Sequence, residues 1–180
     1  MWQYAWTIPA SLFIALFAVW FSHWLSRINE YRKAISSVRG EIDVNIATYD
    51  LICKEIDDDL TLREEHKMVS WPYHSFHDLA WSTYRGVILL RNPEVAVKID
   101  KAYSHIPIAN KSLDRMKEIK SMVEEAIYVQ GSIPKIDIDE LWKKTLSDAK
   151  RYISEELLPR LKEAKELLDK ESEGWLRRLF

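Results

Sequence analysis

Two histidines and an aspartate form the most metal-like pattern in the chain. His74, His77 and Asp78 lie close together, and a His-x-x-His spacing at a helix start can bring two imidazoles to one metal ion. His66 or His105 would complete such a site. The same residue types are equally typical of a helix N-terminus, as caps or surface residues. A di-iron carboxylate site would need Glu-x-x-His on two helices, and none of these histidines has a glutamate three positions before it. We therefore predict no metal and no cofactor.

The other reactive groups also argue against catalysis. Cys53 has no histidine near it in the sequence, which is typical of a core thiol rather than a nucleophile. The chain lacks a Gly-x-x-x-x-Gly-Lys phosphate loop. Its net charge is −2, and residues 41–65 carry nine acids against two bases, which disfavours nucleic acid. We predict a protein that is not an enzyme and binds no nucleic acid. The acidic stretch is either a solvated face or a docking surface for a basic partner.

Four polar residues on predicted helices form a further candidate site. Glu41 and Asn45 are four positions apart, so they share one helix face. Tyr103 and Asn110 lie a heptad apart on another helix. If the two helices pack antiparallel, these side chains meet as a hydrogen-bonded cluster inside the bundle. Two interpretations stay open: a buried polar network that fixes the packing register, and a pocket that senses a ligand.

The first 26 residues differ from the rest of the chain, because all 26 basic and 28 acidic residues lie from position 27 onward. Residues 8–21 are apolar except for one serine. Trp2 and Trp6 precede this run, Trp20 lies near its end and Trp24 follows it. Tryptophan favours the membrane interface, and Trp2 to Trp24 spans roughly 33 Å as a helix, close to a bilayer core of about 30 Å. A signal peptide would have a basic start and a small-residue cleavage site. Both are missing, so we expect residues 1–26 to be a retained transmembrane anchor.

The flanking charges predict the orientation of this anchor. Arg27, Arg32, Lys33 and Arg39 follow it against the single acid Glu30, whereas no basic side chain precedes it. Basic residues stay in the cytoplasm. We therefore expect a single-pass protein of the cell membrane, with the N-terminus outside and residues 27–180 in the cytoplasm.

Apolar residues of the body repeat at helical spacing and predict an all-α fold. The clearest repeat is a heptad stripe of Ile28, Tyr31, Ile35, Val38, Ile42, Asn45, Tyr49, Ile52 and Ile56. It follows the anchor directly, so we expect the transmembrane helix to continue into an antiparallel long-helix bundle with coiled-coil-like packing. Acids at a helix C-terminus oppose its dipole, so this helix should end near the acidic run 55–59.

Three further helices are expected after this one. The second should cover about 75–91, and the third should begin at Asn92-Pro93 and run to about 130, kinked by Pro107 near Tyr103. The fourth should cover 139–173 with a bend at Pro159. We expect an anchor of residues 1–26, a bundle of residues 27–174 and an amphipathic tail of residues 175–180.

The tail combines large apolar residues with two arginines. In an up-down bundle the fourth helix returns toward the membrane, where Trp175 would rest in the interface with Arg177 and Arg178 facing anionic lipid. The alternative is that Trp175, Leu179 and Phe180 cap the bundle core. Both interpretations fit the sequence.

Several short motifs of residues 39–110 resemble those of a loosely defined group of small prokaryotic proteins with one membrane helix and a helical cytoplasmic domain. The shared pattern is Glu-x-x-x-Asn on the first helix, Ala-Trp on the next, and Ala-Tyr-x-x-Ile followed by Asn on the third. Here it corresponds to Glu41, Asn45, Ala80, Trp81, Ala102, Tyr103, Ile106 and Asn110. The resemblance implies the fold and adds no activity.

These observations favour a membrane-anchored helical bundle that acts as a protein–protein interaction or scaffold module. Its expected partners are the lipid bilayer and another protein or a second copy of itself. The alternative is a sensor or regulatory module in which a ligand or partner shifts the helix packing through the anchor helix.

Overall fold

Helices make up all the regular structure of the part of the chain that the structure describes. The computed structural model describes residues 7–64, 73–130 and 137–177. The helices are α1 (Thr7–Glu64), α2 (Leu79–Arg91), α3 (Pro93–Tyr103), α4 (Ile106–Gln130), α5 (Asp137–Tyr152), the π-helix η1 (Ile153–Leu157) and α6 (Leu158–Arg177). The all-α fold class predicted from the sequence is confirmed.

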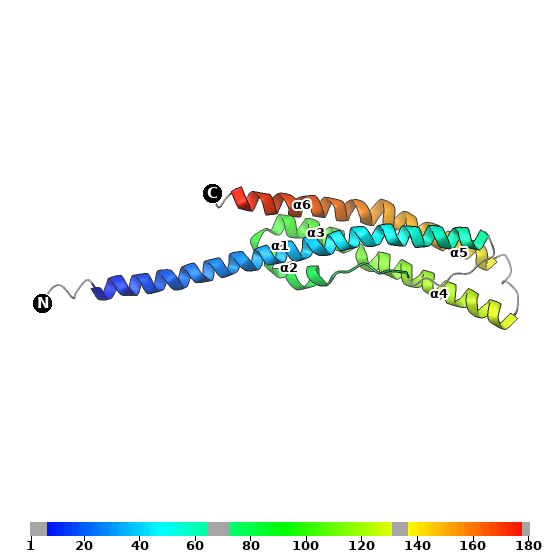
Figure 1. Cartoon of the computed structure of the whole chain (residues 1–180), viewed down its shortest axis with the longest axis horizontal. Coiled ribbons are helices and arrows are strands. Elements are labelled where there is room, and N and C mark those ends of the chain that lie inside the picture. Colours follow the sequence, from blue (N-terminus) through cyan, green and yellow to red (C-terminus); the bar gives the residue numbers. More distant parts are fainter. Residues whose placement is uncertain (1–6, 65–72, 131–136, 178–180) are drawn as a thin grey trace.

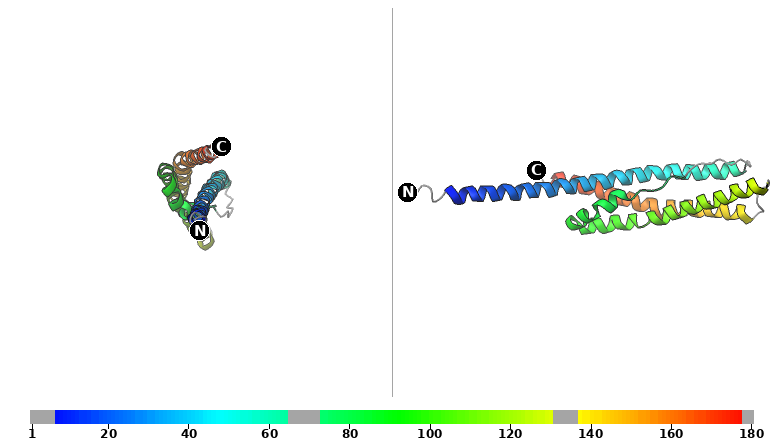
Figure 2. Two further views of the ribbon diagram at one scale, coloured as in Figure 1. Left: turned by 90° about the vertical axis from the view of Figure 1, so that its left-hand side faces the viewer. Right: turned by 90° about the horizontal axis from the view of Figure 1, so that it is seen from below.

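The helices form four long rods that pack side by side. The rods are α1, segment 73–78 with α2, α3 with α4, and α5 with η1 and α6, and successive rods run in opposite directions (Figures 1 and 2). The α2–α3 turn and the end of α6 lie at the end of the bundle from which α1 projects (Figure 1). The bundle therefore has one end close to the N-terminal part of α1 and one end far from it.

Helix α1 is 58 residues long, about 87 Å at 1.5 Å per residue. Its predicted stripe is buried in the core, with Tyr49 half-buried. The predicted end near residues 55–59 is wrong, because α1 continues to Glu64. Acids of this stretch are paired with cations of other elements, Asp57 with Lys150 and Asp59 with Lys120, and these pairs offset their conflict with the helix dipole.

Helix α2 begins at Leu79 rather than near residue 75. Segment 73–78 before it is not helical. Its backbone groups are bound by side chains of α1 and α4, which replace the hydrogen bonds that a helix would make.

Both prolines predicted to distort a helix lie at an irregular point. The single kinked helix expected after Asn92 is instead two helices: α3 ends at Tyr103 and α4 begins at Ile106. The break lies where the kink was expected, because Pro107 has no N–H for the carbonyl of Tyr103. In the last rod, η1 ends two residues before Pro159, and the N–H of Leu158 donates to the carbonyl of Ile153. The bend expected at Pro159 is thus accompanied by a π-helical turn.

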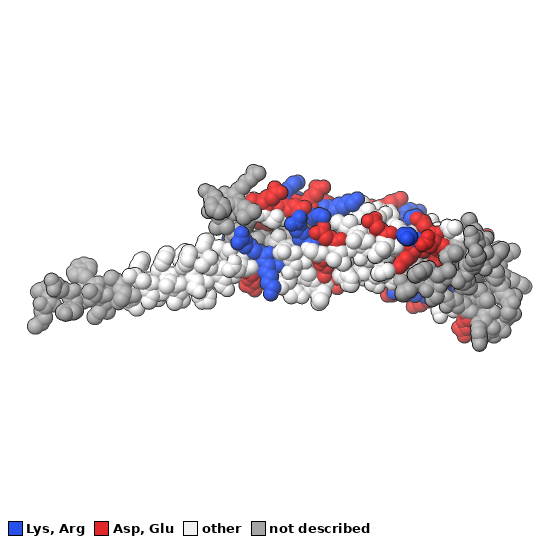
Figure 3. Space-filling view, viewed as in Figure 1, with Lys and Arg blue, Asp and Glu red and all other residues white. Residues whose placement is uncertain are grey.

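The N-terminal part of α1 lies outside the bundle. Its large apolar side chains from Leu12 to Leu25 are exposed, and Ile28 is the first buried residue among those the structure describes. Figure 3 shows this part of the described surface without charged side chains, in contrast to the bundle. By length and composition it is one helix that could cross a membrane.

Candidate functional site

Glu41 of α1 caps the start of helix α2. Its carboxylate accepts hydrogen bonds from the backbone N–H groups of Ala80 at 2.7 Å and Trp81 at 3.2 Å. These groups belong to the first turn of α2, where free N–H groups and the helix dipole favour a negative charge. Asp78 precedes the helix but makes no capping bond with its side chain. A residue 39 positions earlier in the chain therefore supplies the cap.

Tyr103 of α3 completes the surroundings of this carboxylate. Its hydroxyl donates to Glu41 Oε1 at 2.8 Å, and its ring stacks on that of Trp81 with 5.5 Å between the centroids. Burial, followed by the hydrogen bond to Glu41, raises the pKa of Tyr103 far above its ordinary value. The hydroxyl thus stays protonated and remains a donor at neutral pH.

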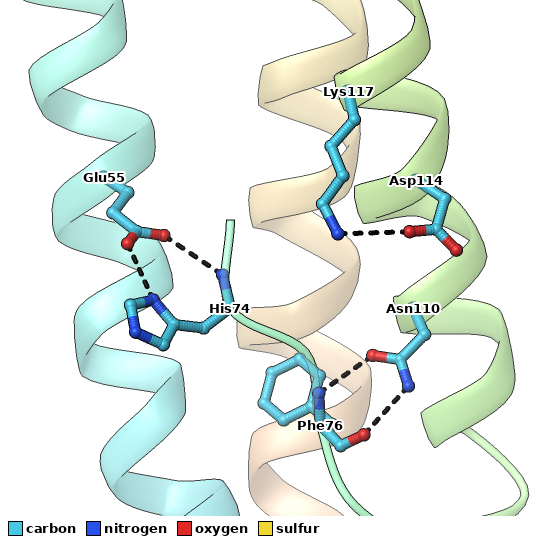
Figure 4. A network of polar contacts seen from close by, with 6 residues as sticks. All are labelled: Glu55, His74, Phe76, Asn110, Asp114 and Lys117. Atoms are coloured by element: carbon cyan, nitrogen blue, oxygen red, sulfur yellow. Dashed lines mark hydrogen bonds and ion pairs between the residues drawn. The ribbon is translucent and has the colours of Figure 1, made fainter. Parts of the chain in front are cut away.

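Asn45 and Asn110 hold segment 73–78 from two sides. Asn45 of α1 accepts from the N–H of His77 and donates to its carbonyl, both at 2.8 Å. Asn110 of α4 makes the same pair of bonds to Phe76, both at 2.9 Å (Figure 4). Each amide thereby reproduces the two-bond pattern that one strand residue offers another. The segment lies between α1 and α4, and side chains of these helices bind both backbone groups of Phe76 and His77.

The structure therefore brings all four predicted cluster residues to one short stretch, residues 76–81. Glu41 and Tyr103 bond directly to each other. The two asparagines bond instead to the backbone between their helices. Both oxygens of Glu41 and both polar atoms of each asparagine have partners within the chain.

A second buried network, at Asp59, was missed from the sequence. Lys120 of α4 lies with its Nζ 3.3 Å from Asp59 Oδ2, and these two side chains are only 10% and 6% exposed. Tyr73 donates a hydrogen bond to the same carboxylate. Burial, and then Asp59, raises the pKa of Tyr73 far above its ordinary value. The signal was present, because Asp59 and Lys120 each occupy the next position of an otherwise apolar heptad stripe.

The histidines of the metal-like pattern point to different partners. His74 Nδ1 lies 2.7 Å from Glu55 Oε1 on α1 (Figure 4), and the described contacts of His77 are those of its backbone with Asn45. Within residues 7–64, 73–130 and 137–177, no three His, Cys, Asp or Glu side chains gather where they could hold a metal ion. His74 thus attaches segment 73–78 to α1 through its side chain and its N–H, and His77 does so through its backbone.

The aromatic and basic residues predicted for the membrane interface are described only in part. Trp20 and Trp24 lie on the projecting part of α1 and are 59% and 38% exposed. Trp2, Trp6 and Arg178 lie outside the described residues, as do the side chains of Trp175 and Arg177.

Comparison of the chain with protein-family models, with curated proteins and with solved structures found no match.

Proposed function

We propose that the protein is a single-pass membrane protein whose bundle lies in the cytoplasm and serves as a protein–protein interaction module. The observation that carries this proposal is a second stripe on α1, on the face opposite the buried one. It consists of Gly40, Val44, Ala47 and Leu51, all exposed. Val44 and Leu51 are large apolar residues, 51% and 49% exposed.

The second stripe has the spacing of a coiled-coil seam. Its residues follow one another at intervals of four, three and four, so they form one continuous line along the helix. A side chain built at Gly40 would meet nothing within 4 Å in this chain. A small residue at such a position lets a partner helix approach closely. We therefore propose that a helix of a partner, another protein or a second copy, packs along this stripe.

The anchor is supported by the exposed apolar surface of α1. The large side chains from Leu12 to Leu25 are exposed, and an exposed apolar belt of this length is costly in water. The basic residues that follow it favour a cytoplasmic bundle. The stripe would then lie on the cytoplasmic side of the membrane. It would begin about 22 Å along α1 from Leu25, at Gly40.

The polar site favours an interaction module over a ligand sensor. Each hydrogen-bonding atom of the Glu41 carboxylate and of the two asparagine amides is already bound within the chain. A ligand at this site would have to displace segment 73–78. We therefore assign these residues to holding the bundle together.

The test is crosslinking in native membranes with a photoreactive residue at position 44 of the full chain. We expect a discrete adduct from position 44, and none from position 98, where Lys98 is exposed on α3. An adduct of twice the chain mass of 21.3 kDa identifies a second copy, and any other mass a different protein. Adding Leu51→Glu to the position-44 protein should abolish the adduct. Equal adducts from positions 44 and 98, or no effect of Leu51→Glu, would contradict the proposal.

A further inference from the structure

We propose that the α2–α3 turn is a second membrane contact, which inserts into the headgroup layer of an anionic lipid surface. This inference rests on the proposed anchor and extends it. The turn consists of the last residues of α2, Leu89, Leu90 and Arg91, and of Asn92 and Pro93.

A shared carboxylate fixes the position of this turn along α1. Glu171 of α6 accepts a hydrogen bond from the Tyr31 hydroxyl at 2.9 Å and another from the Asn92 side-chain amide at 3.3 Å. Asn92 also caps α3, since its side chain accepts from the N–H of Val95. The turn is therefore held level with Tyr31. Tyr31 lies six residues after Leu25, or about 9 Å along the helix.

This level lies beside the headgroup layer when the apolar part of α1 fills the bilayer core. The core is about 30 Å thick and the whole bilayer about 40–45 Å, which leaves roughly 5–8 Å of headgroups on each side. Transmembrane helices are tilted by about 20° on average. A tilt toward α2 brings the turn closer to the lipid. Figure 1 shows the turn at the end of the bundle from which α1 projects.

The side chains of the turn have the chemistry of an interfacial contact. Leu90 is 90% exposed and Leu89 is 44% exposed, and Arg91 next to them is exposed as well. Among the described large apolar residues of the bundle, Leu90 is the most exposed. Neither leucine belongs to the buried core of the described residues. Insertion of leucines between headgroups beside an arginine is the arrangement of membrane-surface segments.

The charges around the turn are complementary to anionic lipid. The exposed bases at this level are Arg27, Arg32, Lys33, Arg91 and Lys170, and the exposed acids are Glu30, Glu94 and Glu173. Figure 3 shows basic side chains gathered where the bundle meets the projecting part of α1. Basic residues next to a membrane are attracted by the negative potential of anionic lipids. The surplus of bases is complementary to an anionic surface, and the place of the turn next to the proposed anchor makes the lipid headgroups that surface.

The experiment measures the depth of single labelled positions in the full chain, reconstituted in lipid nanodiscs. Cys53 is first replaced by serine, and an environment-sensitive fluorophore is placed on Leu90→Cys. Val19→Cys, in the apolar part of α1, reports the anchor, and Met122→Cys on α4 reports a distant exposed site, since both native side chains are exposed. Nanodiscs contain phosphatidylcholine with or without phosphatidylglycerol, and a brominated lipid serves as the quencher.

We expect quenching at positions 19 and 90 and none at position 122. Quenching at position 90 should fall at least twofold without phosphatidylglycerol, at high salt or with Arg91→Glu, whereas position 19 should not change. Quenching at 19 but not at 90 overturns the membrane contact and leaves the anchor standing. A blue-shifted signal at 90 without quenching also overturns it, because a protein surface then covers the turn. No quenching at 19 refutes the anchor itself.

Discussion

The two asparagine clamps show how a few residues hold a non-helical segment inside a helical bundle. Asn45 is fully buried, and Asn110 is half-buried. Each binds both polar groups of one backbone residue. A buried backbone group without a hydrogen-bond partner lowers the free energy of unfolding by about 1–3 kcal/mol. The clamps therefore stabilise the fold mainly by preventing this loss, and less by the net strength of their own bonds.

Replacing Asn110 with alanine tests this at a single residue. Both groups of Phe76 lose their partner, so the free energy of unfolding should fall by about 2 kcal/mol or more. Urea unfolding of the full chain in detergent micelles, followed by circular dichroism, measures it. Lys111→Ala is the matched control, because Lys111 is the exposed next residue of the same helix. A loss no larger than that of Lys111→Ala would show that water replaces the amide.

The sequence led to the residues of this site but not to their partners. Asn45 stands out because it interrupts the apolar stripe, and Glu41, Tyr103 and Asn110 because they belong to the motifs that carry the resemblance. Only Glu41 and Tyr103 meet, and the other bonds go to backbone atoms of residues 76, 77, 80 and 81. Backbone groups look alike in every sequence, so a periodicity argument finds the polar side chain and misses its backbone partner. The resemblance carried by these motifs stays a prediction.

At the scale of elements, the irregular points of two rods lie side by side. The break between α3 and α4 contains His105, whose Nδ1 lies 2.7 Å from the Tyr152 hydroxyl at the end of α5, just before η1. Glu156 and Arg160 of the last rod and Lys101 of α3 also act on this imidazole. Burial, and then the Arg160 charge, lowers the pKa of His105 below its ordinary value of 6.5.

This lowered pKa predicts a loss of stability in mild acid. Between the folded pKa and 6.5 the unfolded chain binds more protons than the folded one, so stability falls as the pH drops through 6.5. His105→Gln keeps a polar side chain without this titration. Thermal unfolding of both proteins between pH 7.5 and 5 should show the steeper fall in wild type. Parallel profiles would mean that His105 charges freely in the folded state.

The sequence predicted a helix boundary only where the residues that determine it lie close to it in the chain. Pro107 predicted a kink near Tyr103, where α3 ends, because a missing N–H acts within four residues. The start of α2 and the end of α1 were misplaced, because Asn110, Asn45 and Lys150 act on them from other rods. The π-helical form of η1 next to Pro159 had no local signal of its own.

At the scale of the whole molecule, α1 runs without a break from the projecting apolar part into the far end of the bundle. Cys53 lies in the bundle part of α1 and is half-buried. The proposed orientation therefore gives this thiol a defined side of the membrane.

The apolar repeats predicted the all-α bundle from the sequence because a helix buries one face whatever its partner is.

A membrane-impermeant maleimide tests the proposed orientation. In intact cells Cys53 should remain unlabelled, and it should react once the membrane is permeabilised and the protein is unfolded. Gln3→Cys combined with Cys53→Ala should react in intact cells, because the N-terminus is proposed to lie outside. Labelling of Cys53 in intact cells would place the bundle on the other side.

The pairing of the first and last helices affects the order in which the chain can fold during its synthesis. Helix α1 packs against α6, with ion pairs from Arg39 to Asp169 and from Asp43 to Lys165. The ribosome makes α6 after the other described helices, so the apolar face of α1 has no final cover until α6 has been made. A nascent chain that stops before α6 would expose that face beside the membrane. The bundle can therefore close completely only once α6 has left the ribosome.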